Sequence, residues 1–181
     1  DTILITMAPA VLVMALGYPA GGALGDWLFK KTKRGRNIVS AVGVLLGAIL
    51  LYLTMIVPLE QTTLFMIMLI VAAFFIPFAS ANVLSTIYDL TLPEIRSSAN
   101  AVESLFENAG ATVAPLVAGI VADAFSLKDA IIILCTSTWL LCFIFFLFVI
   151  AWIPKDIEKL RKVMAERAAA DRAGQASAKP A

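Results

Sequence analysis

The sequence predicts an all-α integral membrane protein with five transmembrane helices. Of its 181 residues, 61% are hydrophobic and 15% are charged, whereas soluble domains are usually about 45–50% apolar and about 25% charged. The mean hydropathy is +0.92. The apolar residues also form continuous runs without the alternation that strands show, and only helices and closed barrels can span lipid.

Five apolar runs reach the roughly 20 residues needed to cross the hydrocarbon core. They occupy residues 3–24, 38–57, 63–87, 97–122 and 130–153, so that residues 1–153 form the transmembrane region. The connections between the runs are short, which predicts that successive helices are antiparallel neighbours.

The tail at residues 154–181 is predicted to be cytoplasmic, with an amphipathic helix followed by a disordered segment from residue 173. Ile157, Leu160 and Met164 share one helical face among charged residues. A helix lying on the inner leaflet and a solvated helix both fit this pattern.

The distribution of lysine and arginine predicts the orientation of the helices. Only Lys128 falls on one side of the membrane, while the basic residues of the first connection, the third connection and the tail all fall on the other. Cytoplasmic loops carry an excess of Lys and Arg. We therefore expect a multi-pass protein of the cell membrane whose basic loops and C-terminus are cytoplasmic.

The five runs differ in their polar content. The second and fifth contain no charged residue, which predicts outer or lipid-facing helices. The third carries Asn82, which we expect either to take part in a substrate site or to form an interhelical hydrogen bond. Pro77 in the third run and Pro115 in the fourth mark candidate kinks.

The fourth run carries Glu103, Glu107 and Asn108 within its apolar sequence. Counting from Ser97, Glu107 lies about 15 Å along the helix, close to the midplane of a core about 30 Å thick. Carboxylates within a membrane usually face a bundle interior or a water-filled cavity. Glu103 lies one turn away on the same face, and two ionised carboxylates at this spacing repel each other. At least one of them is therefore expected to take up a proton, which suits a proton-coupling site or a site for a cationic substrate group.

Several functions are excluded or disfavoured by composition. The chain contains no histidine, which removes His-based nucleophile systems and His-ligated metals. Cys135 and Cys142 lie in one apolar run and are predicted to be packing residues. We expect no metal, no cofactor and no nucleic-acid partner. The chain begins in apolar sequence without a methionine, so we expect it to be the later part of a longer protein.

The segment "GALGD" at 22–26, followed by "KRGR" at 33–36, resembles the cytoplasmic loop motif of the major facilitator superfamily (MFS). The stretch "LPEIRSSANAVESLFENAGATVAPLVAGIVAD" at 92–123 is similar to the tenth-to-eleventh loop and the eleventh helix of that family. The resemblance covers residues 1–153. It implies that the five spans are helices eight to twelve of a twelve-helix transporter, a partial C-terminal six-helix bundle whose N-terminal half is missing from this chain.

The resemblance also implies a cytoplasmic latch that opens and closes during transport. It would be formed by the motif and by the next inner loop, with the residues Gly22, Asp26, Arg34, Gly35, Arg36, Glu94 and Arg96. The sequence departs from the stricter motif at Trp27, where the family has Arg or Lys, and in the longer loop before Arg34.

The function implied is a secondary active transporter, not an enzyme, that moves a small organic solute by alternating access. We expect proton coupling through Glu107 and Glu103, with the bilayer, protons and the solute as partners. Within this fold, export of a drug or amphiphile, export of a lipid-like anion, and uptake of a sugar or organic acid are the alternatives. A membrane-embedded enzyme and a non-transporting receptor are alternatives of a different class.

Overall fold

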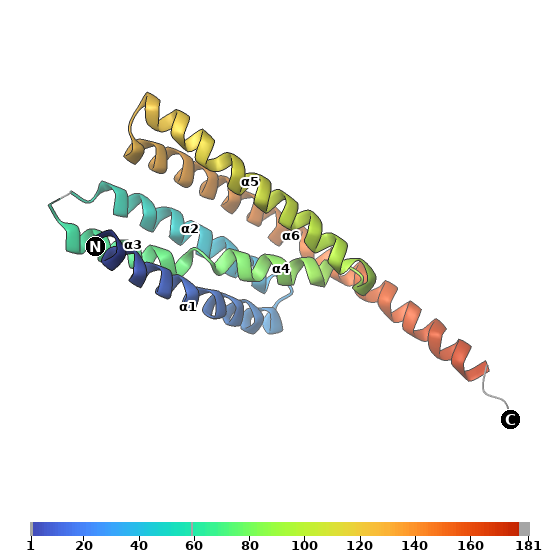
Figure 1. Cartoon of the computed structure of the whole chain (residues 1–181). Coiled ribbons are helices and arrows are strands. Elements are labelled where there is room, and N and C mark those ends of the chain that lie inside the picture. Colours follow the sequence, from blue (N-terminus) through green and yellow to red (C-terminus); the bar gives the residue numbers. More distant parts are fainter. Residues whose placement is uncertain (1, 59, 178–181) are drawn as a thin grey trace.

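The computed structural model describes residues 2–58 and 60–177, and within this part of the chain the regular structure is helical (Figure 1). In chain order the elements are α1 (Thr2–Lys31), α2 (Gly35–Ile56), α3 (Thr62–Phe75), α4 (Phe78–Leu90), a short 3-10 helix η1 (Pro93–Ile95), α5 (Arg96–Ala124) and α6 (Leu127–Ser177). By length and composition they provide five membrane spans, the third of which is formed by α3 and α4 together. The predicted all-α fold with five spans is confirmed.

The connection between α1 and α2 is shorter than the hydropathy pattern indicates. Helix α1 continues past the apolar run to Lys31, and α2 begins at Gly35 rather than at residue 38. Two basic residues end α1, where positive charge interacts favourably with the helix dipole. A methyl group at Gly35 would collide with the backbone of Leu28, so the tight turn requires glycine here. The short turn brings the end of α1 next to the start of α2.

Pro77 divides the third span into two helices. Helix α3 ends at Phe75 and α4 begins at Phe78, because proline has no backbone N–H and its ring clashes with the preceding turn. Pro77 is fully buried among these helices. Pro115, the other candidate kink, lies inside α5, which continues from Arg96 to Ala124.

Helix α6 joins the fifth span and the tail into one helix of 51 residues that passes through Pro154. Ile153 and Ile157 are buried at 3% and 2% exposure, so the first turns of the tail pack against the bundle, and the rest extends away from it (Figure 1). Where disorder is predicted from residue 173, the helix continues to Ser177; residues 178–181 lie outside the described part.

A stripe of glycines on α1 allows its backbone to approach the third span closely. Gly17, Gly21 and Gly25 are spaced four residues apart and face Phe74, Phe78 and Asn82 in turn. A methyl group at Gly21 would lie 2.7 Å from the Phe78 Cα atom. Small residues at such spacing permit close contact of helices in membranes, where packing drives association.

Helix α2 occupies a more central position than its uncharged sequence suggests. It packs against α1, α3, α4 and α6. One face is buried and consists mainly of small and polar residues, namely Gly35, Asn37, Ser40, Ala41, Gly43, Gly47, Ala48, Leu51 and Thr54. The opposite face exposes large apolar residues such as Ile49 and Tyr52. The expectation of an outer helix is therefore right for only one side of α2.

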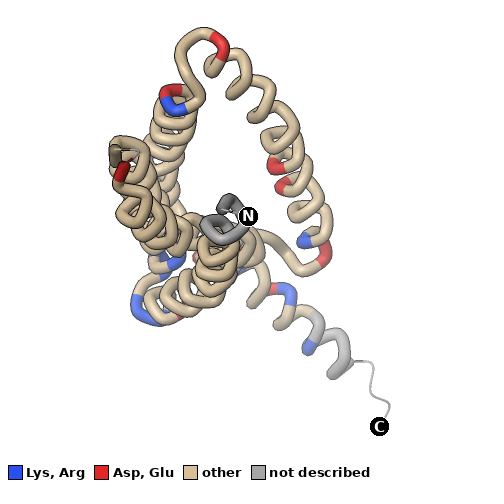
Figure 2. The backbone as a smooth tube through the Cα atoms, turned by 60° about the vertical axis from the view of Figure 1, so that its left-hand side comes forward, with Lys and Arg blue, Asp and Glu red and all other residues tan. Residues whose placement is uncertain are grey.

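Helix α5 is the least packed of the spans. It contacts mainly α6, makes a small contact with α4, and has no buried residue. Figure 2, turned by 60° about the vertical axis from the view of Figure 1, shows the backbone with acidic positions along α5. Among the described residues, α5 is thus held mainly by α6 and leaves much of its surface exposed.

Alanine substitutions at Gly21 and at its neighbour Gly22 test whether the glycine stripe is needed for close packing. Gly21→Ala is expected to lower the free energy of unfolding by about 1–3 kcal/mol, because overpacking forces backbones apart. At Gly22 the added methyl group would make an ordinary 3.8 Å contact with the Ala81 Cβ. Gly22→Ala is therefore expected to be neutral or stabilising by up to about 1 kcal/mol, as in other helix interiors. Thermal unfolding of the detergent-solubilised protein measures both, and equal losses would contradict this packing.

Candidate functional site

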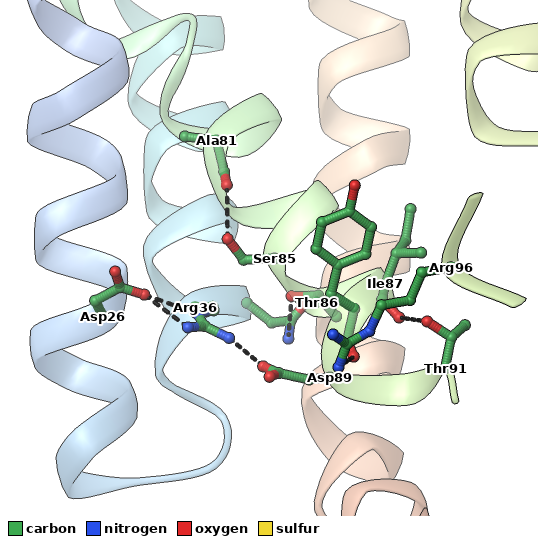
Figure 3. Close-up of polar contacts among 11 residues, drawn as sticks. Asp26, Arg36, Ala81, Ser85, Thr86, Ile87, Asp89, Thr91 and Arg96 are labelled. Atoms are coloured by element: carbon green, nitrogen blue, oxygen red, sulfur yellow. Dashed lines mark hydrogen bonds and ion pairs between the residues drawn. The ribbon is translucent and has the colours of Figure 1, made fainter. Parts of the chain in front are cut away.

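Arg36 at the start of α2 joins the ends of three helices. Its Nε and Nη2 atoms donate to Asp26 Oδ1 of α1 at 2.9 and 2.8 Å. Its Nη1 donates to Asp89 Oδ2 of α4. Figure 3 shows the three side chains in a row from α1 through α2 to α4. We call this group, Asp26, Arg36 and Asp89, the ion-pair cluster.

Within the cluster, Arg36 is largely shielded from solvent, whereas Asp26 is exposed to it. The Arg36 side chain is 16% exposed, whereas that of Asp26 is 58% exposed. The Phe29 ring covers the guanidinium, with 4.3 Å between its centroid and Arg36 Cζ. Because Arg36 is planar and has donors on both edges, it can bind two carboxylates at once, which lysine cannot do with the same geometry.

Both Arg36 contacts to Asp26 end on a single oxygen. Asp26 Oδ2 has no hydrogen-bond or ion-pair partner among the described residues. An exposed carboxylate oxygen of this kind can accept a charge-assisted hydrogen bond from a guanidinium or a helix N-terminus. Asp26 therefore has capacity for a further contact outside the cluster.

Asp89 is a member of the cluster that the sequence analysis did not single out. It lies near the end of α4, at the same end of the bundle as the basic first connection. Asn37, one residue after Arg36, donates a buried hydrogen bond of 3.4 Å to Thr86 Oγ1, one turn before Asp89. Polar residues therefore line the α2–α4 contact over a full turn. An acid at the basic end of a span was the one signal that could have identified Asp89.

Of the other residues assigned to the latch, Glu94 and Arg96 make separate contacts. Glu94 Oε1 accepts from Arg167 Nη1 of α6 at 3.3 Å, with both side chains exposed. Arg96 Nη2 donates to the Tyr88 carbonyl at 3.2 Å and so holds the start of α5 against the end of α4. Neither residue joins the ion-pair cluster in this structure.

The remaining motif residues are Arg34, Gly35 and Gly22, and none of them contributes a side chain to the ion-pair cluster. Arg34 is exposed, and its side chain has no ion pair among the described residues. Gly35 forms the tight turn described above. Gly22 has only an ordinary contact with Ala81, and its neighbours Gly21 and Gly25 make the close approach to α4.

Asn82 lies in the α1–α4 contact. It is 1% exposed and donates from Nδ2 to the Gly21 carbonyl at 3.0 Å and to the Phe78 carbonyl at 2.8 Å. These contacts favour the interhelical hydrogen bond, one of the two interpretations of this residue. Its Oδ1 atom points at Gly25, where a Cβ atom would collide with it.

The polar residues of α5 lie on the helix that has no buried side chain. Glu107 is exposed and has no hydrogen-bond or ion-pair partner among the described residues; Glu103 is half-buried and receives only a 3.5 Å contact from the neighbouring Ser104 hydroxyl. Asn108 donates to the Ser104 carbonyl at 2.7 Å within its own helix. These three residues lie close together along α5, whereas the contacts of Asn82 are made with α1 and within α4.

No group of histidine, cysteine and acidic side chains that could hold a metal ion occurs within residues 2–58 and 60–177. Two groups that include residues predicted from sequence stand out in the structure. One is the ion-pair cluster at the basic end, and the other is the glutamate pair along α5.

Five membrane-spanning helices, with charge concentrated at one end and carboxylates along one span, define a helical multi-pass membrane protein. The family model of the Major Facilitator Superfamily matches residues 2–178. The chain belongs to this family, and its class is therefore that of a membrane transporter. No curated protein and no solved structure matches the chain.

The ion-pair cluster predicts that the unfolding free energy depends strongly on Arg36. Arg36→Gln leaves Asp26 and Asp89 without their shared cation and is expected to cost about 1–3 kcal/mol of unfolding free energy, between the values for exposed and buried pairs. Arg34→Gln, the control two residues away, is expected to change stability by less than about 0.5 kcal/mol. Denaturant titration in mixed micelles measures both variants.

A second substitution makes this test specific to the cluster. In the Arg36→Gln background, Asp89→Asn removes one of the uncompensated carboxylates and is expected to recover part of the lost stability. If Asp89→Asn costs the same in both backgrounds, the two side chains are not coupled and the assignment fails.

Proposed function

We propose that this chain provides helices eight to twelve of a proton-coupled secondary transporter that moves a small organic solute by alternating access. In this proposal the N-terminal half of the same protein supplies the other wall of the cavity. Family membership and the placement of polar residues on α5 support it. Glu103, Glu107 and Asn108 form the solute and proton site.

The single observation that carries the proposal is the unpartnered state of Glu107. A glutamate in a membrane span is costly, on the order of 2.5 to 3.5 kcal/mol for the most polar residues on insertion scales. A structural carboxylate offsets this cost with an ion pair or hydrogen bonds, as Asp89 does with Arg36. Glu107 has no such partner within the described residues, so its role is with water, protons or solute.

The ion-pair cluster is proposed to be one side of a conformational latch. Arg36 fixes Asp26 in place, and the free Oδ2 atom then faces a donor from the other half of the transporter. The contact would be made in the outward-open state and lost in the inward-open state, as rocking of two halves around a central site requires. Glu94, bound to Arg167, and Arg96, bound to the Tyr88 carbonyl, would hold the neighbouring inner loop in register.

The proposed orientation follows from charge. The connection between α1 and α2, the start of α5 and the extension of α6 lie at the same end of an antiparallel bundle and carry the basic residues. This end is proposed to be cytoplasmic in the cell membrane by the positive-inside rule.

Proton coupling is tested by Glu107→Gln in the intact transporter reconstituted into proteoliposomes. Radiolabelled sugars and carboxylates, together with the amphiphilic cation ethidium, form the solute panel, which separates uptake of polar solutes from drug or amphiphile export. The variant is expected to lose gradient-driven accumulation while it retains solute counterflow, because exchange without net proton movement needs no protonation cycle. Asp123→Asn, at the far end of α5, is the control and is expected to keep both activities.

Each outcome of this experiment decides a different part of the proposal. Gradient-driven accumulation that survives in Glu107→Gln contradicts the proton role. Loss of counterflow as well assigns Glu107 to solute binding. The absence of counterflow for the whole panel in the wild-type protein would favour the enzyme or receptor alternatives.

The latch is tested by comparing two variants that each remove one carboxylate from Arg36. Asp26→Asn removes the proposed contact to the other half, whereas Asp89→Asn disturbs the cluster alone. A charge-assisted hydrogen bond contributes about 1.5–3 kcal/mol, so Asp26→Asn is expected to raise the ratio of inward-open to outward-open states by about tenfold or more. Distances between spin labels at the two ends of the transporter measure this ratio. Equal shifts in both variants would show that Asp26 acts only within this bundle.

A further inference from the structure

We propose that the basic end of this bundle holds a specific binding site for an anionic phospholipid. In this site the phosphate headgroup occupies a cationic pocket between the α1–α2 turn and α6. One acyl chain lies in an adjacent apolar groove between α1 and α2. The site is distinct from the ion-pair cluster and from the glutamates of α5.

The cationic pocket is formed by two segments that are far apart in the sequence. It has a volume of about 410 Å³ and is lined by Phe29, Lys30, Lys31, Thr32, Lys33 and Arg161. Four of these six residues are basic. Arg161 comes from the part of α6 beyond the span, and it is brought to the turn because Ile153 and Ile157 are buried against the bundle.

The charges of this pocket are not neutralised by any ion pair among the described residues. The ion pairs of the described residues involve Arg36 with Asp26 and Asp89, and Arg167 with Glu94. None of them includes Lys30, Lys31, Lys33 or Arg161. The nearest acids on α6 in sequence are Asp156, Glu158 and Glu166, which are exposed and form no ion pair with the pocket. Clustered cations of this kind just outside a membrane span attract anionic lipids.

The apolar groove lies on the membrane-spanning side of this pocket. It has a volume of about 330 Å³, and its walls come from Leu24, Trp27 and Leu28 of α1 and from Ile38, Val39 and Val42 of α2, with phenylalanines of the third span below. Leu24 and Val42 are each 48% exposed. Nothing polar within the groove would disfavour a hydrocarbon chain.

Lys31 connects the pocket to the groove. Its Nζ atom lies 3.8 Å from the centroid of the Trp27 ring, and Lys31 lines the pocket while Trp27 lines the groove. A tryptophan at the membrane interface with a cation above it is the arrangement expected where a headgroup meets an acyl chain. This continuity favours a lipid over a free phosphate, which would use the pocket alone.

Native mass spectrometry of the intact transporter tests the site with dioleoyl phosphatidylglycerol and dioleoyl phosphatidylcholine as probes. The quadruple variant Lys30→Gln, Lys31→Gln, Lys33→Gln and Arg161→Gln is expected to bind phosphatidylglycerol about tenfold or more weakly, since each basic residue near an anionic lipid adds to affinity. Binding of phosphatidylcholine is expected to be unchanged. The matched control removes four charges elsewhere on α6, with the substitutions Lys155→Gln, Lys159→Gln, Lys162→Gln and Arg172→Gln, and is expected to retain phosphatidylglycerol binding within about twofold.

The groove is tested separately with Val42→Trp, which fills it from an exposed position without entering the helix packing. This variant is expected to weaken binding of dioleoyl phosphatidylglycerol and to leave binding of the water-soluble headgroup glycerophosphoglycerol unchanged. Inorganic phosphate that displaces the lipid at equal concentration would show a free-anion site and overturn the proposal. Equal losses in the pocket variant and in its charge-matched control would overturn it as well, since they would indicate unspecific attraction to the inner leaflet.

Discussion

The architecture depends on how closely α1 can approach the third span. Lipid offers little hydrophobic drive for helices to associate, so contact must come from packing and from hydrogen bonds between helices. Gly21 and Gly25 provide the packing, because each presents bare backbone to Phe78 and Asn82. Asn82 then donates to the Gly21 carbonyl across the same contact. With larger residues at these positions the helices would separate, and Arg36 could no longer reach carboxylates on both of its sides.

This constraint explains why the ion-pair cluster has the geometry it has. Asp26 is one residue beyond the last glycine of the stripe, and Asp89 lies two turns beyond Asn82 on α4. Close packing near the middle of the helices therefore sets the separation of the two acids at their ends. The tight turn at Gly35 places Arg36 between them. The cluster is thus fixed by three helices, because Arg36 of α2 binds Asp26 of α1 and Asp89 of α4.

Much of this fold could be predicted from sequence, because the spans depend on local composition. Hydropathy placed the five spans and the acids of α5, and the motif placed Asp26 and Arg36. Hydropathy marks the depth of lipid and not the end of a helix. Helix α1 therefore continues past the predicted limit of its span, and the fifth span and the predicted tail helix form the single helix α6. Asp89, Gly21 and Gly25 were missed because their importance depends on which helix faces which. A local stretch of sequence does not determine which residues it contacts in space. Glu94 and Arg96 were therefore grouped with Asp26, although in the structure they contact Arg167 and the Tyr88 carbonyl.

The two sets of acids differ in how many contacts depend on their negative charge. Asp26 and Asp89 bind one arginine, so protonation of either would break a contact that holds helices together. Glu107 contacts no cation and no donor within the described residues, so no contact of this bundle depends on its charge. A coupling site needs this freedom, because its charge must change in every cycle while the fold stays intact. The lack of packing around α5 therefore agrees with the proposal: the helix proposed to carry the exchangeable charge is the one in which no described residue is buried.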